Sequence, residues 1–154
     1  PRIGNHNWFL AYTHVAHDCV VGDHCVFSNN ATLAGHVEVG DHVILSGFTG
    51  VHQFCRIGAH AMIAAGAIVL QDVPPFVTAA GYPATPRGIN SEGLRRRGFT
   101  ADEILAIRRA YKTLYREGRA LDDARAALVT AAESVPALAA LIDFLAVPGR
   151  GIIR

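Results

Sequence analysis

The first half of the chain repeats an apolar residue at every sixth position. From residue 3 onward each sixth residue is aliphatic or aromatic, through twelve positions and without a break in phase. An α-helix repeats at 3.6 residues and a half-buried strand at 2, so neither element explains a period of six. The twelve positions are Ile3, Phe9, Val15, Val21, Phe27, Leu33, Val39, Leu45, Val51, Ile57, Ile63 and Val69.

A second period of eighteen residues is superimposed on the first. The apolar residue is followed by glycine at Ile3-Gly4, Val21-Gly22, Val39-Gly40 and Ile57-Gly58. Three six-residue faces in each of four repeats are typical of a parallel β-helix, in which each coil contacts only its neighbours. We therefore predict a β-helix over residues 1–74. Residues eighteen apart are then vertical neighbours, about 4.8 Å from each other.

The pattern changes after Pro74. Residues 75–90 are rich in proline and glycine and are predicted to form a connecting loop along the solenoid. From Ser91 the apolar spacing becomes helical, and Thr100 with Glu103 forms the signature of a helix capping box. The predicted fold is thus a β-solenoid plus α: a β-helix followed by a small helical bundle over residues 91–154.

Composition excludes several classes of partner. The net charge of +1 over 154 residues gives no reason to expect a nucleic acid. No apolar run reaches the roughly 20 residues of a membrane helix, so no membrane insertion is expected. Three cysteines, Cys19, Cys25 and Cys55, fall at the small positions of the repeat, where buried thiols fit best. We therefore expect a reducing, cytoplasmic setting.

Eight histidines lie between residues 6 and 60, and four of them are eighteen apart. This regular set should stack in one external column. Two interpretations remain open for it: a solvated corner of the coil, or a metal-binding ladder of neutral imidazoles. The four residues are His6, His24, His42 and His60.

The other four histidines fall at irregular positions of the repeat. The period places His17 below Gly35 and Gln53, and Asp18 below His36. An imidazole can act as a general base, and a glycine N–H can stabilise an oxyanion. A catalytic role, a metal site and a passive surface all remain possible, although zinc requires convergent ligands and these histidines are staggered. The irregular set is His14, His17, His36 and His52.

A run of three arginines, Arg95 to Arg97, follows Gly93-Leu94. It is either a solvated helix face or a phosphate clamp, because arginine pairs with phosphate in a bidentate manner. No GxxxxGK[ST] motif is present, which argues against ATP as the ligand.

Several of these stretches resemble one family, the acyl-carrier-protein–UDP-N-acetylglucosamine O-acyltransferases, which begin lipid A synthesis. The resemblance covers essentially the whole chain and includes the helical tail. It implies a left-handed β-helix and a homotrimer with active sites between subunits. The stretches are His14-Val15-Ala16-His17-Asp18-Cys19, residues 29–37, Val51-His52-Gln53-Phe54-Cys55, Gln71-Asp72-Val73-Pro74-Pro75 and residues 90–99.

The resemblance also implies a reaction and its residues. A (3R)-3-hydroxyacyl chain would pass from acyl carrier protein to the 3-hydroxyl of UDP-N-acetylglucosamine. His17 would be the general base, Asp18 its orienting partner and Gly35 the oxyanion donor, while Ala65 would lie at the acyl-chain ruler. Sugar and diphosphate contacts would come from His14, His36, His52 and Gln53, and nucleotide-side contacts from Asn90, Glu92, Arg96 and Arg97.

The same resemblance implies no bound cofactor and no metal, since acyl carrier protein supplies the acyl-phosphopantetheine. We expect the basic surface around Arg95–Arg97 and Arg108–Arg109 to receive that acidic protein. The family's solenoid is longer than four coils, so N-terminal coils are expected to be missing, and an inactive fragment is one expectation for this chain. The alternatives are a γ-carbonic-anhydrase-like zinc enzyme and a non-catalytic trimeric scaffold.

Overall fold

The computed structural model describes residues 1–154 and begins with four coils of three short strands each. The strands build three parallel sheets, in the orders β1-β4-β7-β10, β2-β5-β8-β11 and β3-β6-β9-β12. Their bounds are β1 (Arg2–Ile3), β2 (Trp8–Phe9), β3 (His14–Val15), β4 (Val20–Val21), β5 (Val26–Phe27), β6 (Thr32–Leu33), β7 (Glu38–Val39), β8 (Ile44–Leu45), β9 (Gly50–Val51), β10 (Arg56–Ile57), β11 (Met62–Ile63) and β12 (Ile68–Val69).

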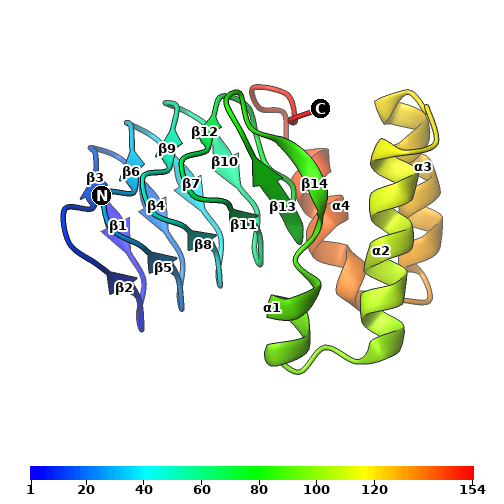
Figure 1. Ribbon diagram of the computed structural model, residues 1–154. Coiled ribbons are helices and arrows are strands. Elements are labelled where there is room, and N and C mark those ends of the chain that lie inside the picture. Colours follow the sequence, from blue (N-terminus) through cyan, green and yellow to red (C-terminus); the bar gives the residue numbers. More distant parts are fainter.

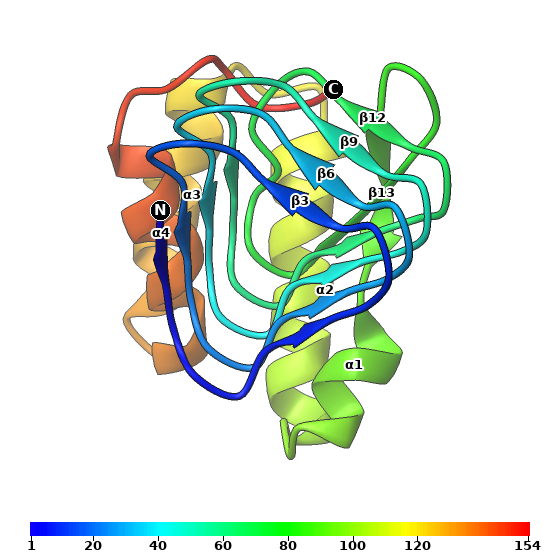
Figure 2. The ribbon, with the colours of Figure 1, turned by 90° about the vertical axis from the view of Figure 1, so that its left-hand side faces the viewer.

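The eighteen-residue period is the register of these sheets. Phe9 pairs with Phe27, and Leu33 pairs with Val51. The second residue of each strand points to the axis, and Phe27 and Leu33 are fully buried there. Seen from the N-terminal end, the chain turns counterclockwise as it recedes, so the β-helix is left-handed (Figure 2). The predicted fold class is confirmed.

Every corner of the solenoid turns through a residue in the left-handed backbone region. Ten residues spaced six apart, from His6 to His60, have φ between 58° and 66° although none of them is glycine. This conformation costs roughly 1–2 kcal/mol for an L-residue, so the surrounding ladder must impose it. The bond from His36 N–H to the His17 carbonyl, 3.0 Å long, is one of the ladder bonds at these corners. The residues are His6, Tyr12, Asp18, His24, Asn30, His36, His42, Phe48, Phe54 and His60.

The predicted loop over residues 75–90 is wrong, because this segment forms a β-hairpin. β13 (Val77–Ala80) adds in parallel to β11, and β14 (Thr85–Ile89) pairs antiparallel with β13. Pro86 is tolerated in β14 because this is an edge strand with no further neighbour that needs its N–H groups. The hairpin therefore covers the last coil of the second sheet (Figure 1).

The C-terminal part is helical, as predicted, and stacks beyond the hairpin (Figure 1). Thr100 and Glu103 form the expected capping box at the start of α2, with bonds of 3.1 and 2.9 Å. A second apolar core lies between the helices around Ile107 and Leu128. The elements are α1 (Ser91–Arg96), α2 (Ala101–Tyr115), α3 (Leu121–Ala132), the 3₁₀ turn η1 (Pro136–Leu138) and α4 (Ala139–Ala146). None of these helices has both the length and the apolar character needed to cross a membrane.

A buried ion pair joins the solenoid to the C-terminal segment. Asp72 is fully buried and accepts hydrogen bonds from the backbone N–H of Arg56 at 2.8 Å and from its Nε at 3.1 Å. The Arg56 guanidinium also donates to the carbonyls of Phe144 and Val147 and lies 4.1 Å from the centre of the Phe144 ring. The charge of the largely buried guanidinium is thus compensated by a carboxylate, two carbonyl groups and an aromatic ring.

Candidate functional site

The strongest candidate site is the corner that follows β3, where His17 and Asp18 lie side by side. His17 Nδ1 is 2.9 Å from Asp18 Oδ2. Neighbouring residues in a strand point to opposite faces, but Asp18 has φ 59° and turns its carboxylate back toward the imidazole. The hydrogen bond from His17 lowers the pKa of the Asp18 carboxyl. With the proton on Nδ1, the Nε2 lone pair of His17 is free to accept another proton.

Gly35 lies directly above His17 in the next coil. A β-carbon built at Gly35 would approach His17 Cε1 to 2.7 Å and Nε2 to 2.8 Å, which is too close for any side chain. The imidazole therefore packs against bare backbone. The Gly35 N–H makes no backbone hydrogen bond of its own and is available to a ligand beside the imidazole.

A column of three side chains borders this pair. Asp18, His36 and Phe54 occupy the same corner position in successive coils. His36 Nε2 lies 3.7 Å from Asp18 Oδ2, and its ring stacks on Phe54 with centroids 4.6 Å apart. The rings of His17 and His36 are nearly perpendicular, at 88°. Phe54 is not among the site residues predicted from the sequence, although the eighteen-residue register places it above His36.

The remaining residues predicted around His17 surround the same corner. Gln53 stands one coil above Gly35, since the N–H of Phe54 donates to the Gly35 carbonyl. His52 precedes Gln53, just after β9, and both side chains are exposed. His14 is exposed on the outer face of β3. The chain thus presents imidazole, carboxylate and carboxamide groups on its surface at this corner.

The predicted nucleotide-side residues belong to a different corner. Asn90 is buried, caps α1 through its side chain and donates from Nδ2 to the His60 carbonyl at 3.1 Å. Arg97 Nη1 lies 3.1 Å from His60 Nδ1. Glu92 is paired with both Arg95 and Arg96. The His60 corner joins the first sheet to the second, whereas the His17 corner joins the third sheet to the first (Figure 2). One chain does not bring the two groups together.

The four regularly spaced histidines do stack as predicted. Their ring centroids are 4.9–5.0 Å apart and their planes are within 7–12° of parallel. The column ends under Phe76, Phe99 and Arg97. Burial, with a smaller contribution from Arg97, lowers the pKa of His60 from 6.5 to about 4. Parallel rings do not direct their nitrogen lone pairs at a common point, so this geometry does not favour the metal-ladder interpretation.

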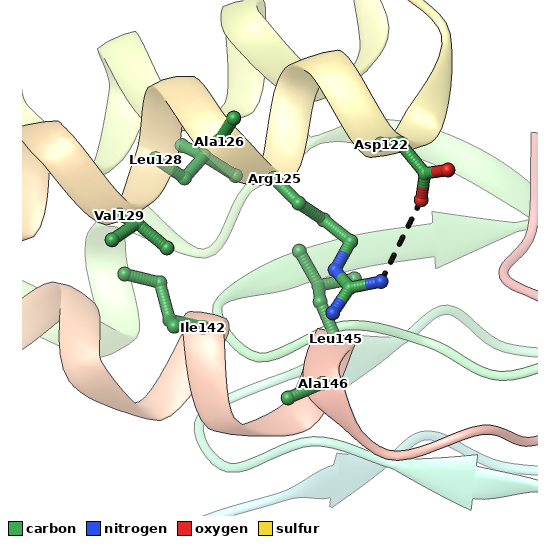
Figure 3. Close-up of a pocket in the computed structure, with 8 residues that line it drawn as sticks. All are labelled: Asp122, Arg125, Ala126, Leu128, Val129, Ile142, Leu145 and Ala146. Atoms are coloured by element: carbon green, nitrogen blue, oxygen red, sulfur yellow. Dashed lines mark ion pairs between the residues drawn. The ribbon is translucent and has the colours of Figure 1, made fainter.

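Two further features lie away from both groups. Ala65 is exposed in the turn between β11 and β12, at the third corner of the coil. An apolar cavity of about 350 Å³ lies between α3 and α4 and is bordered by the Arg125–Asp122 ion pair (Figure 3). It contains none of the predicted site residues. The candidate site is therefore an exposed corner of the solenoid.

The fold and the His17–Asp18 corner place the chain among the hexapeptide-repeat transferases, and family comparison agrees. Residues 1–35 match the bacterial transferase hexapeptide (six repeats) family model. Residues 72–153 match the second domain of UDP-N-acetylglucosamine O-acyltransferase. The chain belongs to the UDP-N-acetylglucosamine O-acyltransferase family, which confirms the resemblance seen in the sequence.

Individual relatives give the same result. The acyl-[acyl-carrier-protein]–UDP-N-acetylglucosamine O-acyltransferase of Thiobacillus denitrificans is 59% identical over 153 residues, covering 99% of this chain and 59% of the relative. The solved UDP-N-acetylglucosamine acyltransferase of Francisella novicida superimposes with a TM-score of 0.96 at 43% identity, over 99% of this chain and 56% of that one. An Acinetobacter baumannii structure has a TM-score of 0.94 at 45% identity, over 97% of this chain and 58% of that one. The chain thus spans 56–59% of the length of these relatives.

Proposed function

We propose that this chain is part of an enzyme that transfers a (3R)-3-hydroxyacyl group from acyl carrier protein to the 3-hydroxyl of UDP-N-acetylglucosamine, the first step of lipid A synthesis. The observation that carries the proposal is the His17–Asp18 pair, held against the bare backbone of Gly35. The name of the Thiobacillus denitrificans relative includes both acyl carrier protein and UDP-N-acetylglucosamine, and that of the Francisella novicida structure includes UDP-N-acetylglucosamine.

The geometry suits acyl transfer by general-base catalysis. Asp18 accepts a hydrogen bond from the Nδ1–H group of His17 and so orients the ring. The Nε2 atom of His17 then removes the proton from the sugar hydroxyl. The sugar oxygen attacks the thioester carbon, and the Gly35 N–H stabilises the negative charge on the carbonyl oxygen. The C–S bond then breaks, and the thiolate of the phosphopantetheine takes the proton back from His17. No resident cofactor or metal takes part, because the carrier protein supplies the activated acyl group.

A homotrimer would complete the site. The nucleotide-side residues lie at another corner of the coil, so they would meet His17 of a neighbouring copy rather than their own. The outer face of the second sheet is suited to that contact: Trp8 is 68% exposed, and Val26, Ile44 and Met62 continue the apolar row. In this arrangement His14, His36, His52 and Gln53 contact the sugar and diphosphate, and Asn90, Glu92, Arg96 and Arg97 of the next copy contact the nucleotide.

The acidic carrier protein would dock on α2. Arg95 and Arg96 are already paired with Glu92, which compensates part of their charge. Arg108, Lys112 and Arg116 follow one another at single-turn spacing along α2 and border a cavity of about 540 Å³. Because these three cations form no ion pair with the chain, they are the better complement to an acidic protein.

Two finer assignments follow from the same proposal. Ala65 would limit the acyl chain, and its small exposed side chain leaves room at the third corner. The reaction would take place in the cytoplasm, a setting consistent with the free buried thiols of Cys19, Cys25 and Cys55.

The alternative of a γ-carbonic-anhydrase-like enzyme is less well supported. Such a zinc site needs three convergent imidazoles. Here only two imidazoles, those of His17 and His36, come together, and the third group is the carboxylate of Asp18. A non-catalytic scaffold remains the other alternative. Calorimetry with UDP-N-acetylglucosamine separates it from an enzyme, since a scaffold has no reason to bind that nucleotide.

The proposal is tested by replacing His17 with Ala in the protein. Loss of a general base typically lowers the rate by about 10²–10⁴-fold, and we expect at least that loss in thioester-dependent acylation of UDP-N-acetylglucosamine. His24→Phe, in the stacked histidine column, is the matched control and should retain activity. Light scattering should show the same mass for both variants. Wild-type turnover by His17→Ala would overturn the mechanism.

A further inference from the structure

The two sets of histidines differ in how their nitrogen atoms are directed. In the regular column the rings are parallel and face to face, so neighbouring lone pairs run side by side. The rings of His17 and His36 are instead perpendicular, with centroids 5.2 Å apart. Both present a nitrogen to the same carboxylate oxygen, Oδ2 of Asp18. Only in this second arrangement do nitrogen atoms of two imidazole rings converge on one point.

The distances between these atoms are close to those of a metal site. His17 Nδ1 and His36 Nε2 lie 2.9 and 3.7 Å from Asp18 Oδ2, and one ligand atom from each of the three residues lies within 4.8 Å of the others. Bonds of 2.0–2.1 Å in tetrahedral geometry separate two ligand atoms by about 3.3 Å. The observed pairs fall on either side of that value. The two imidazole nitrogens lie within 4.8 Å of each other, so shifts of at most about 1.5 Å would form the site, and all three side chains are exposed enough to make them.

The surrounding residues hold the three ligands in place. Asp18 and His36 share the same left-handed corner conformation in successive coils. Phe54 supports the ring of His36 from above, and the missing side chain of Gly35 makes room for His17. Cys19, the nearest thiol in sequence, is excluded because it is buried and its Sγ donates to the Ala34 carbonyl at 3.1 Å. The donor set is thus two imidazoles and one carboxylate.

We propose that His17, Asp18 and His36 form a reversible binding site for a divalent transition-metal ion, with Zn²⁺ as the best match. Imidazole donors favour zinc over Mg²⁺ and Ca²⁺, which prefer oxygen ligands. Water fills the remaining coordination positions on the exposed side. The bound ion takes the place of the proton between His17 and Asp18 and so acts as an inhibitor. Binding itself is independent of the proposed function, but the inhibition rests on it.

Calorimetric titration of the protein with Zn²⁺, in a buffer that does not bind metal, tests the site. We expect one zinc per chain. His36→Phe, which extends the aromatic column, and Asp18→Asn should each weaken binding at least about tenfold, because one of three ligands is lost. His24→Phe is the matched control and should bind zinc like the wild type. Mg²⁺ should produce no binding heat. Absence of zinc binding, or equal affinity in His36→Phe and the wild type, would overturn the proposal.

Two further measurements separate the metal site from the enzyme. Co²⁺ in place of zinc should give the visible absorption bands of nitrogen and oxygen coordination, and His36→Phe should lose them. Acylation should fall on addition of Zn²⁺ and return with a chelator. Stoichiometric zinc with unchanged turnover would refute the inhibition. A metal-free protein without any turnover would instead count against the proposed function, and the calorimetric result would still decide the metal site.

Discussion

Single residues at the corners of the coil carry most of the chemistry of this molecule. The sequence period was sufficient to place His17, Gly35 and Gln53 in one column, and the structure has them there. It could not show that Asp18 turns back toward His17, because that depends on a backbone angle of φ 59° at a residue other than glycine. It also did not show that Phe54 supports His36, because a stacking contact depends on ring orientation.

At this scale, Gly35→Ala should impair catalysis without unfolding the chain. The new β-carbon would meet the His17 ring at 2.7 Å and displace it from its place beside the Gly35 N–H. A misplacement of about 1 Å can cost on the order of 10²-fold in rate, and we expect a loss of that size in steady-state acylation. Gly47→Ala is the matched control, since a β-carbon there meets nothing closer than 3.5 Å. Equal turnover of the two variants would contradict the proposed role of Gly35.

His60 should make stability depend on pH. Its pKa of about 4 in the folded chain lies below its ordinary value of 6.5, mainly because of burial. The unfolded chain therefore binds more protons between these values, and the free energy of unfolding falls as the pH drops from 6.5 toward 4. His60→Phe removes this contribution. Urea unfolding at several pH values should show a shallower decline for the variant, and identical declines would refute the assignment.

At the scale of the element, local patterns predicted the strands and helices that follow one period. The six-residue repeat marked every strand of the solenoid, and Thr100 with Glu103 marked the start of α2. The hairpin β13–β14 was missed because Pro83, Pro86 and the glycines around them are typical of loops. β13 is fixed by pairing with β11, a tertiary contact that no local pattern contains, and β14 is fixed by pairing with β13.

The stability of the contact between the solenoid and the C-terminal helices should depend on Asp72. Asp72→Ala leaves the Arg56 guanidinium largely buried without its carboxylate, which typically costs about 3–5 kcal/mol. Glu117→Ala, which breaks the exposed pair with Arg119, is the control and should change stability by less than about 1 kcal/mol. Urea denaturation measures both values. If Asp72→Ala lowers the free energy of unfolding as little as the control does, the ion pair does not stabilise the contact between the solenoid and the helices.

At the scale of the whole molecule, the predicted site divides between two corners. The sequence supplied the members of both groups, and the family resemblance implied that they act together. The period alone could not show that α1 lies beside the His60 corner, since that position results from Asn90 and Arg97 binding His60. The division is the main structural reason to expect a neighbouring copy at the His17 corner.

The proposed trimer can be tested on the outer faces of the sheets. Ile44→Glu places a charge in the apolar row of the second sheet and should shift the protein toward monomers, because burial of an unpaired charge in an interface is costly. Glu38→Gln, at the equivalent outward position of the first sheet, should leave the assembly unchanged. Light scattering after size-exclusion chromatography measures the masses. A trimer that survives Ile44→Glu would place the interface elsewhere.

The strict register of the coils has a consequence for how such a protein can change its dimensions. Any insertion of one complete eighteen-residue turn keeps every inward side chain inward and every corner a corner, because each strand pairs only with the equivalent strand above and below it. The solenoid can therefore lengthen only in discrete steps of about 4.8 Å. A row of binding groups along its wall is lengthened by the same step, so the length of a substrate that it fits would change in increments rather than continuously.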